Sequence, residues 1–295
     1  MKEFEVSDKR KAVWNVELQI MDEIDRICRK HNIRYFLAGG SMLGAARHNG
    51  FIPWDDDIDV GMFREDYERF LKVCESELSK EFFLQTNHND KGYTLFLAKI
   101  RKNDTTAIRQ KEFICGATFN QGIFVDIVPF DNIPNHFIPR YFQYISLELV
   151  ILLLSRSIYF KSYKHKTWRN QLSHLLGKFV LMFTTPQKMS QLCVSIIKLY
   201  SNKKTKYVGE ISTIYNYKKS RRLRSLYDEL IDHQFEDRIY KIPKRYDEIL
   251  DLAYGDWRTP RPDAPSLHGG MFYDPDHPYT DYLSGKRQID FDAPL

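Results

Sequence analysis

Two aspartates separated by a single residue open a short apolar run in the first third of the chain. Asp57 and Asp59 belong to the sequence DDDIDVGMF, in which we expect residues 57–63 to form a strand. Because side chains alternate along a strand, the two carboxylates project to one face while Ile58 points to the other. Adjacent carboxylates repel each other and raise one pKa unless a cation lies between them. The pair therefore predicts a catalytic Mg²⁺ (or Mn²⁺) site shared with substrate phosphates.

A third acid, Asp126, lies in the sequence GIFVDIVP, where we expect a strand over residues 122–130. If this strand lies beside the first, Asp126 completes a catalytic and metal-binding cluster of three carboxylates. The alternative is a solvated carboxylate or one at a sheet edge. Asp55 and Asp56 come directly after Pro53. Either they add to the site, with Asp55 as a catalytic candidate, or their side chains bond the backbone of a solvated turn.

A glycine-rich turn precedes these acids. Gly39, Gly40 and Ser41 follow an expected strand at residues 33–38 and lead into a helix that we expect to start at Ser41 and end at residue 48. Paired glycines let the backbone turn sharply and approach a ligand closely. A helix that begins there points free N–H groups at the same spot, which suits a phosphate. Ser41 either adds a hydroxyl or caps the helix, and an ordinary connecting turn is the alternative.

Basic side chains are available to bind substrate phosphates. Lys99 and Arg101 share one face of an expected strand at residues 94–102, and together they would neutralise a pyrophosphate. Exposed strand charges without a function are the alternative. Arg47 stands at the end of the short helix, where it would bind substrate or simply favour the negative end of the helix dipole.

Two stretches of the C-terminal tail, residues 254–260 and 268–270, are polar and rich in glycine. Such composition is unusual for packing alone and favours a loop that contacts substrate. Asp256 is the candidate substrate-binding residue in the first stretch.

Hydrophobic periodicity predicts the elements that position these residues. Helices are expected at residues 8–31, 41–48, 64–78, 138–160, 168–183, 187–200 and near 244–253, and strands at 33–38, 57–63, 82–86, 94–102, 105–110 and 122–130. The tail after residue 255 is rich in Pro, Gly and aromatic residues and is expected to be ordered loop. The outline is an α+β fold, with a mixed sheet flanked by helices and a basic helical insert.

The charge distribution suggests three parts along the 295 residues. The net charge is only +5, yet residues 137–225 hold 17 Lys and Arg against two acids, a net of +15, so the remainder carries −10. We expect residues 1–136 to form the catalytic core, residues 137–225 a basic helical insert, and residues 226–295 a return that completes the catalytic domain. A hydrophobic content of 43% excludes a disordered chain.

The basic insert contains an apolar stretch at residues 141–160, interrupted by Glu148 and Arg156. It fits a buried core helix, a helix lying in the membrane plane, or a marginal membrane span. The run KKSRRLR at residues 218–224 would bind phosphates, and we favour a solvated helix face or an anionic membrane surface over nucleic acid. Four scattered cysteines and an N-terminus without an apolar signal segment favour the cytoplasm.

The segment GGSMLGAARHNGFIPWDDDIDVGM resembles the signature of the LicD family, which includes bacterial phosphocholine transferases and the fukutin-related proteins. The match runs over more than twenty consecutive positions. The sequences LAKIRKNDTTAI, GIFVDIVPFD and YGDWRTP, at residues 97–108, 122–131 and 254–260, resemble later blocks of the family. The likeness covers residues 33–131 and, in the C-terminal third, the last block.

This resemblance implies a nucleotidyltransferase-like fold and the transfer of a phospho-alcohol from a CDP-activated donor. The acceptor would be a hydroxyl of a cell-surface glycan or its lipid-linked precursor, with a divalent metal and release of CMP. Phosphocholine is the expected group, and ethanolamine, glycerol and ribitol headgroups stay open. By position, the resemblance assigns the Gly-Ser turn of the family to Gly40 and Ser41. It assigns the metal-binding carboxylates to Asp57 and Asp59. Asp55 matches the first acid of the motif, and Asp126 matches the third carboxylate of the superfamily.

In the mechanism that we expect, Lys99 or Arg101 balances the negative charge that moves onto the leaving CMP. Asp126, or alternatively Asp55, accepts the proton of the acceptor hydroxyl. A choline headgroup needs an aromatic face. The candidates are Trp54, Trp257, Phe272 and Tyr273.

Two other functions compete with this one. A nucleotidyltransferase would use the same turn and acidic pair to move an NMP group to a small molecule or protein, and its product would carry the nucleotide. A non-enzymatic scaffold would bind a membrane or nucleic acid through residues 137–225. The intact acidic pair argues against a scaffold.

Overall fold

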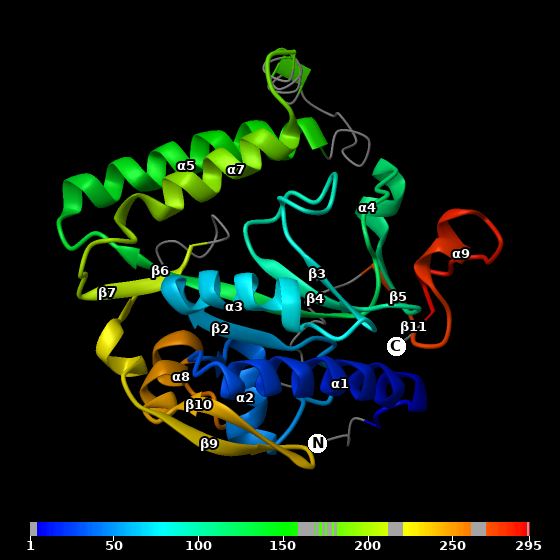
Figure 1. Ribbon diagram of the computed structural model, residues 1–295, viewed down its shortest axis with the longest axis horizontal. Helices are drawn as coiled ribbons and strands as arrows, with labels where there is room; N and C mark the ends of the chain where they lie inside the picture. The colour runs from blue at the N-terminus through cyan, green and yellow to red at the C-terminus, as the bar shows by residue number, and fades with distance from the viewer. Residues whose placement is uncertain are drawn as a thin grey trace.

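A mixed sheet of seven strands lies at the centre of the molecule (Figure 1). The computed structural model describes residues 5–158, 168, 171–172, 175, 179, 182–211, 221–260, 270–293 and 295. The strands of the sheet are β1 (Phe36–Leu37), β2 (Asp59–Phe63), β3 (Phe82–Gln85), β4 (Ala98–Lys102), β6 (Phe124–Ile133), β7 (Tyr207–Glu210) and β8 (Arg222–Leu223). Their order is β1-β2-β6-β4-β3, with β7 beside β6 and β8 beside β7. Only β2 and β6 pair in parallel; the other neighbours in this sheet are antiparallel.

Helices and two small sheets surround the central sheet. The helices are α1 (Asp8–Lys30), α2 (Gly39–His48), α3 (Arg64–Glu77), α4 (Gln110–Cys115), α5 (Phe137–Ile158), α7 (Pro186–Ile197), α8 (Tyr246–Tyr254) and α9 (Tyr279–Leu283), with 3₁₀ turns at Lys198–Tyr200 and Arg224–Tyr227. The small sheets pair β9 (Leu230–Phe235) with β10 (Arg238–Pro243), and β5 (Thr106–Arg109) with β11 (Met271–Asp274). The predicted α+β class is confirmed.

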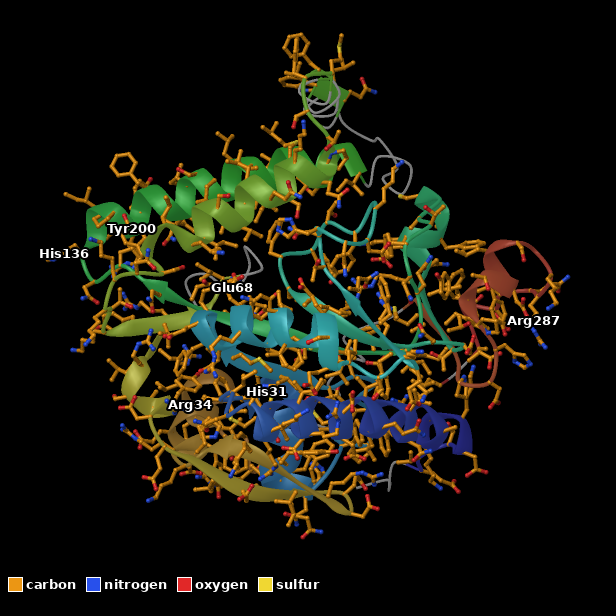
Figure 2. The ribbon with its side chains drawn as sticks, in the orientation of Figure 1. His31, Arg34, Glu68, His136, Tyr200 and Arg287 are labelled. Atoms are coloured by element: carbon orange, nitrogen blue, oxygen red, sulfur yellow. The ribbon has the colours of Figure 1, made fainter. Side chains whose placement is uncertain are left out.

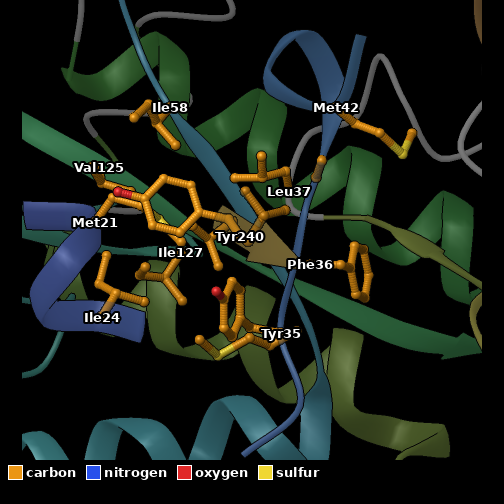
Figure 3. Packing of buried hydrophobic residues seen from close by; sticks show 14 of the residues in the cluster. Met21, Ile24, Tyr35, Phe36, Leu37, Met42, Ile58, Val125, Ile127 and Tyr240 are labelled. Carbon is orange, nitrogen blue, oxygen red and sulfur yellow. The ribbon is translucent and has the colours of Figure 1, made fainter. Parts of the chain in front are cut away.

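The main core lies between α1, α3 and one face of the sheet. Ile24 of α1 packs toward Val125 and Ile127 of β6, and all three are fully buried (Figure 3). Ile58 and Val60, around the start of β2, are fully buried in the same core. Because strand side chains alternate, the residues between these apolar ones are directed to the opposite face. The core therefore decides which face of β2 and β6 carries the acids.

Helices α5 and α7 form a hairpin on the outside of the molecule (Figure 1). They pack on each other through a second apolar cluster that includes Leu147, Leu154 and Cys193. Lys198, in the 3₁₀ turn that follows α7, forms an ion pair of 2.9 Å with Glu68 of α3. Glu68 is labelled in Figure 2.

Within the described chain, Phe137–Ser155 is the one stretch that is long and apolar enough to cross a membrane by length and composition. Its mean hydropathy is 1.4, and 17% of its most apolar window is buried. The interpretation of α5 as a buried core helix is therefore wrong: among the described residues, most of this window is at least partly exposed, although Leu147 and Leu154 are buried.

Several element predictions need correction. Helix α2 begins at Gly39 rather than at Ser41, because Gly39 itself turns the chain with a φ of 51°. The tail is not all loop: β11 and α9 form there, and β11 is held by pairing with β5. The basic segment contains β7 and β8 as well as helices. These short strands depend on partners distant in sequence, which periodicity cannot identify. The helix predicted at residues 168–183 lies largely outside the described residues.

Candidate active site

Three carboxylates meet near the N-terminal ends of two interior strands, β2 and β6. The parallel register of β2 and β6 pairs Asp59 with Asp126, and Asp57 lies just before β2. One oxygen from each of the three side chains can be chosen so that all lie within 4.8 Å of one another. Asp55, Asp56 and Asp57 form a second group that meets the same limit. The structure thus brings together the acids that the sequence singled out.

The N-terminus of α2 faces two of these carboxylates. A Cβ atom on Gly39 would lie 2.9 Å from Oδ2 of Asp59, and one on Gly40 would lie 2.7 Å from Oδ2 of Asp55. Any side chain at either glycine would therefore displace a carboxylate. The unpaired N–H groups and the positive dipole end of the helix favour negative charge at this point.

Ser41 does not cap the helix, because the N-cap position belongs to Ala38. Its Oγ instead accepts a hydrogen bond of 2.8 Å from the backbone N–H of Asp59. This bond joins the first turn of α2 to the start of β2. Ser41 is buried, so in this position it holds the backbone that carries the acid.

The electrostatics of the cluster favour a cation. Burial raises the pKa of Asp59 well above its ordinary value, and the charges of Asp57, Asp126 and Glu210 raise it further. A divalent cation would replace this repulsion by attraction. A donor set made only of carboxylate oxygens is the set that Mg²⁺ prefers, so these residues fit the predicted metal.

Lys99 and Arg101 differ in their surroundings, although both are buried. The register of β4 and β6 pairs Lys99 with Asp126, and the two side chains form an ion pair. Burial lowers the pKa of Lys99, and the Asp126 carboxylate opposes that shift. Arg101 instead donates to Oε1 of Gln85 at 2.6 Å and to the carbonyl oxygen of Gly122. Lys99 therefore contacts one of the three carboxylates, whereas the hydrogen bonds of Arg101 go to Gln85 and Gly122.

The two remaining predicted residues lie at the end of α2 and after α8. Arg47 donates a hydrogen bond of 2.9 Å to the carbonyl oxygen of Trp257, which ties α2 to the loop after α8. Asp256 is exposed in that loop, and hydrogen bonds from Thr259 lower the pKa of its carboxyl. No contact described for either residue reaches the three carboxylates. Residues 268 and 269 of the second predicted loop lie outside the described residues.

Side chains from distant segments support the acidic loop from behind. Arg10 and Trp14 of α1 donate to the carbonyl oxygen of Asp55 at 2.9 and 3.0 Å. The hydroxyl of Tyr273 in β11 lies 3.2 Å from Oδ2 of Asp56. Glu17 is buried nearby, and both desolvation and the charges of the loop acids raise its pKa. Sequence reasoning missed Arg10, Trp14 and Glu17, because they appear as ordinary members of an amphipathic helix.

A pocket adjoins the cluster on the side of Gly39. It has a volume of about 100 Å³ and is bordered by Phe36, Glu210, Tyr254 and others. The prediction did not include Glu210, and it included Tyr254 only as the first residue of the substrate-contacting loop expected at residues 254–260. One signal was available: Glu210 is one of only two acids in the basic segment 137–225.

Comparisons with known proteins show which family the chain belongs to. Residues 32–148 match the family described as LicD/FKTN/FKRP, nucleotidyltransferase domain. The chain is 32% identical over 251 residues to the lipopolysaccharide cholinephosphotransferase LicD of Haemophilus influenzae, which covers 81% of this chain and 88% of that protein. It is 62% identical over 34 residues to the human ribitol 5-phosphate transferase FKRP, 12% of this chain and 7% of that protein. An uncharacterized protein of Rickettsia typhi is 36% identical over 73 residues, 25% of this chain and 23% of its own. The chain belongs to the LicD family.

Proposed function

We propose that the protein is an enzyme that transfers phosphocholine from CDP-choline to a hydroxyl of a cell-surface glycan or its lipid-linked precursor, with release of CMP. The observation that carries the proposal is the cluster of Asp57, Asp59 and Asp126 at the N-terminus of α2. It occurs in a chain that resembles a lipopolysaccharide cholinephosphotransferase over 81% of its length. A nucleotidyltransferase-like classification of the sheet is part of the same proposal.

In this proposal Asp57, Asp59 and Asp126 hold Mg²⁺ or Mn²⁺. When bound, the metal supplies a Lewis acid and neutralises phosphate charge. The three residues converge from the loop before β2, from β2 and from β6, so the fold supplies the geometry before any ligand arrives. The residues' own repulsion, which raises the pKa of Asp59, makes the cluster receptive to positive charge.

The group transfer is a single in-line displacement. The oxygen of the acceptor hydroxyl attacks the phosphorus that bears choline, and the bond from that phosphorus to the bridging oxygen breaks. CMP leaves with the electron pair, and a carboxylate accepts the hydroxyl proton. Asp126 is the first candidate for this base and Asp55 the second. Lys99, paired with Asp126, contributes positive charge beside the reacting groups.

We further propose that the enzyme works at the inner, cytoplasmic face of the membrane, where lipid-linked acceptors are presented. The support lies on α5, whose outer side exposes a row of apolar residues. These are Ile138, Tyr141, Phe142, Ile145, Leu149 and Leu152, each at least 40% exposed. Apart from the adjacent Tyr141 and Phe142, they recur every three or four residues, which places them toward one side of the helix. The +15 charge of residues 137–225 favours anionic lipid.

The proposal is tested by supplying CDP-choline labelled separately in choline and in cytidine, with Mg²⁺ and a lipopolysaccharide acceptor. We expect the choline label in the glycan and the cytidine label in free CMP. Asp59→Asn should reduce transfer by roughly 10³-fold, while Asp104→Asn, a change at an exposed turn residue, should not. Cytidine label in the acceptor would identify a nucleotidyltransferase instead, and near-normal transfer by Asp59→Asn would contradict the assigned role of the cluster.

A further inference from the structure

The pocket beside Gly39 is walled by aromatic rings. The ring centroid of Phe36 lies 5.0 Å from those of both Phe130 and Tyr227, and the last two are 5.4 Å apart. In Figure 3, Phe36 projects from β1 to the side opposite Leu37, and its ring is buried. Tyr254, at the end of α8, borders the pocket with 38% of its surface exposed. Aromatic faces present negative charge density, which attracts cations.

Two carboxylates lie at or beside this pocket. Glu210 borders it, and the Asp59 carboxylate lies beside Gly39, which also borders it. Burial raises the pKa of Tyr254 to about 12, and the neighbouring carboxylates, Asp59 foremost, add to this shift.

One cation, Arg222, also borders the pocket. Its guanidinium donates to the carbonyl oxygens of Leu252 at 3.3 Å and of Arg221 at 3.2 Å. These bonds hold the guanidinium against the last turn of α8 and the backbone of Arg221. An anionic ligand held by Arg222 is therefore an outcome that the experiment must distinguish.

We propose that this pocket, formed by Phe36, Phe130, Tyr227, Tyr254 and Glu210, binds the quaternary ammonium group of the donor's choline. The inference rests on the proposed function. Its geometric basis is Gly39, which borders the pocket and whose missing Cβ atom would lie 2.9 Å from Oδ2 of Asp59. A phosphate at the carboxylates and a cation in the pocket are therefore neighbours, as the two-carbon linker of phosphocholine requires.

The aromatic residues that the sequence suggested for choline are engaged elsewhere. The ring of Trp257 is covered by the Arg258 guanidinium at 4.5 Å. Phe272 has the Lys9 ammonium 5.4 Å from its centroid, and Tyr273 is buried with its hydroxyl at Asp56. Trp54 packs against the main core. Of the rings considered, those of the pocket are the ones that border a cavity beside the carboxylates.

The experiment compares the binding of CDP-choline, CDP-ethanolamine and CDP by calorimetry with Mg²⁺ and without acceptor. Wild-type protein should bind CDP-choline more tightly than the other two. Tyr254→Leu and Glu210→Gln should each weaken CDP-choline by roughly tenfold and leave CDP unchanged. Glu229→Gln, which removes an exposed charge paired with Lys244, is the matched control. Thermal unfolding of each variant checks that it is folded.

The outcomes separate this inference from the proposed function. Equal weakening of CDP and CDP-choline would assign the pocket to the nucleotide, or to a phosphate on Arg222, and overturn the inference. Unchanged affinity in both variants would overturn it as well. If wild-type protein binds no CDP compound, the proposed function fails. Titration with phosphocholine alone then tests the choline site in the pocket. No binding of phosphocholine, or binding that Tyr254→Leu leaves unchanged, would reject that site.

Discussion

At the scale of single residues, Asp59 is placed where it is useful for binding a cation and unfavourable for stability. It is surrounded by Asp57, Asp126 and Glu210, whose charges add to the burial that raises its pKa. The positive end of α2 and the Ser41 hydrogen bond to its backbone hold it there. Repulsion of this kind is characteristic of functional sites, where stability and activity conflict.

We predict that a divalent metal raises the melting temperature of the wild-type protein and not that of Asp59→Asn. Binding to the folded state alone adds about 2.7 kcal/mol at a hundred times the dissociation constant, which corresponds to a shift of roughly 5 °C. The measurement is thermal unfolding in EDTA and in Mg²⁺. In EDTA, Asp59→Asn should melt no lower than wild type, because it loses repulsion. An equal metal shift in both proteins would place the metal elsewhere.

Glu17 gives a prediction on pH. Its folded-state pKa is raised above the unfolded value by burial and by the loop acids, Asp57 foremost. Below the unfolded pKa, Glu17 is protonated in both the folded and the unfolded state, so it does not reduce the free energy of unfolding. As pH rises above about 4.3 the unfolded chain ionises first, so Glu17 makes the protein less stable. In EDTA, Glu17→Gln should melt about 2–4 °C higher than wild type at pH 8, with the gap closing near pH 4. A difference in melting temperature that does not change with pH would contradict the raised pKa of Glu17 in the folded protein.

At the scale of elements, the connection from β2 to α3 depends on a buried ion pair. Arg64, the first residue of α3, donates two hydrogen bonds to Asp131 of β6, of 2.8 and 2.7 Å. Both side chains are buried. The bidentate pair fixes α3 relative to the two parallel strands, and those strands carry Asp59 and Asp126.

Removing one partner of the Arg64–Asp131 ion pair should destabilise the folded protein. We predict that Asp131→Asn lowers the free energy of unfolding by about 3 kcal/mol, because Arg64 would keep its charge in a buried place. Chemical denaturation measures the change. Glu229→Gln, which breaks the exposed pair with Lys244, should change stability by less than about 1 kcal/mol. Similar small effects of both substitutions would mean that Arg64 reaches solvent.

At the scale of the whole molecule, the catalytic candidates and the apolar hairpin belong to different parts. The acids belong to β2, to β6 and to the loop before β2, whereas the exposed row belongs to α5. Figure 1 shows the α5–α7 hairpin on the outside of the molecule, apart from β2. This separation lets one part bind a membrane without burying the other. The ion pair of Lys198 with Glu68 joins the two parts.

Substitution of the outer row should release the protein from membranes. We predict that the double variant Phe142→Asp and Leu149→Asp lowers binding to vesicles containing anionic lipid by about tenfold or more. Sedimentation with liposomes at low salt gives the bound fraction. Ile239→Asp, at an exposed residue of β10, is the control and should bind as wild type does. Wild-type protein that stays entirely in the supernatant would reject membrane docking.

Much of this protein could be predicted from local sequence. The apolar period of α1 placed that helix to within a residue, because an α-helix orders its own side chains with a fixed repeat. The strand predicted at residues 57–63 begins at Asp59, so Asp57 reaches the same cluster from the loop before β2. The acidic pair and the glycine turn were nevertheless visible without a structure.

Other features depend on pairing between distant segments, which no local repeat encodes. The register of β6 with β2 and β4 decided that Asp126 joins Asp59 and that Lys99 joins Asp126. Only the folded chain brought Glu210 and Tyr254 to a pocket beside Gly39. The residue types alone predicted a cation site near the turn. The tertiary structure decided which side chains surround it, because long-range contacts are selected by the packing of the whole core.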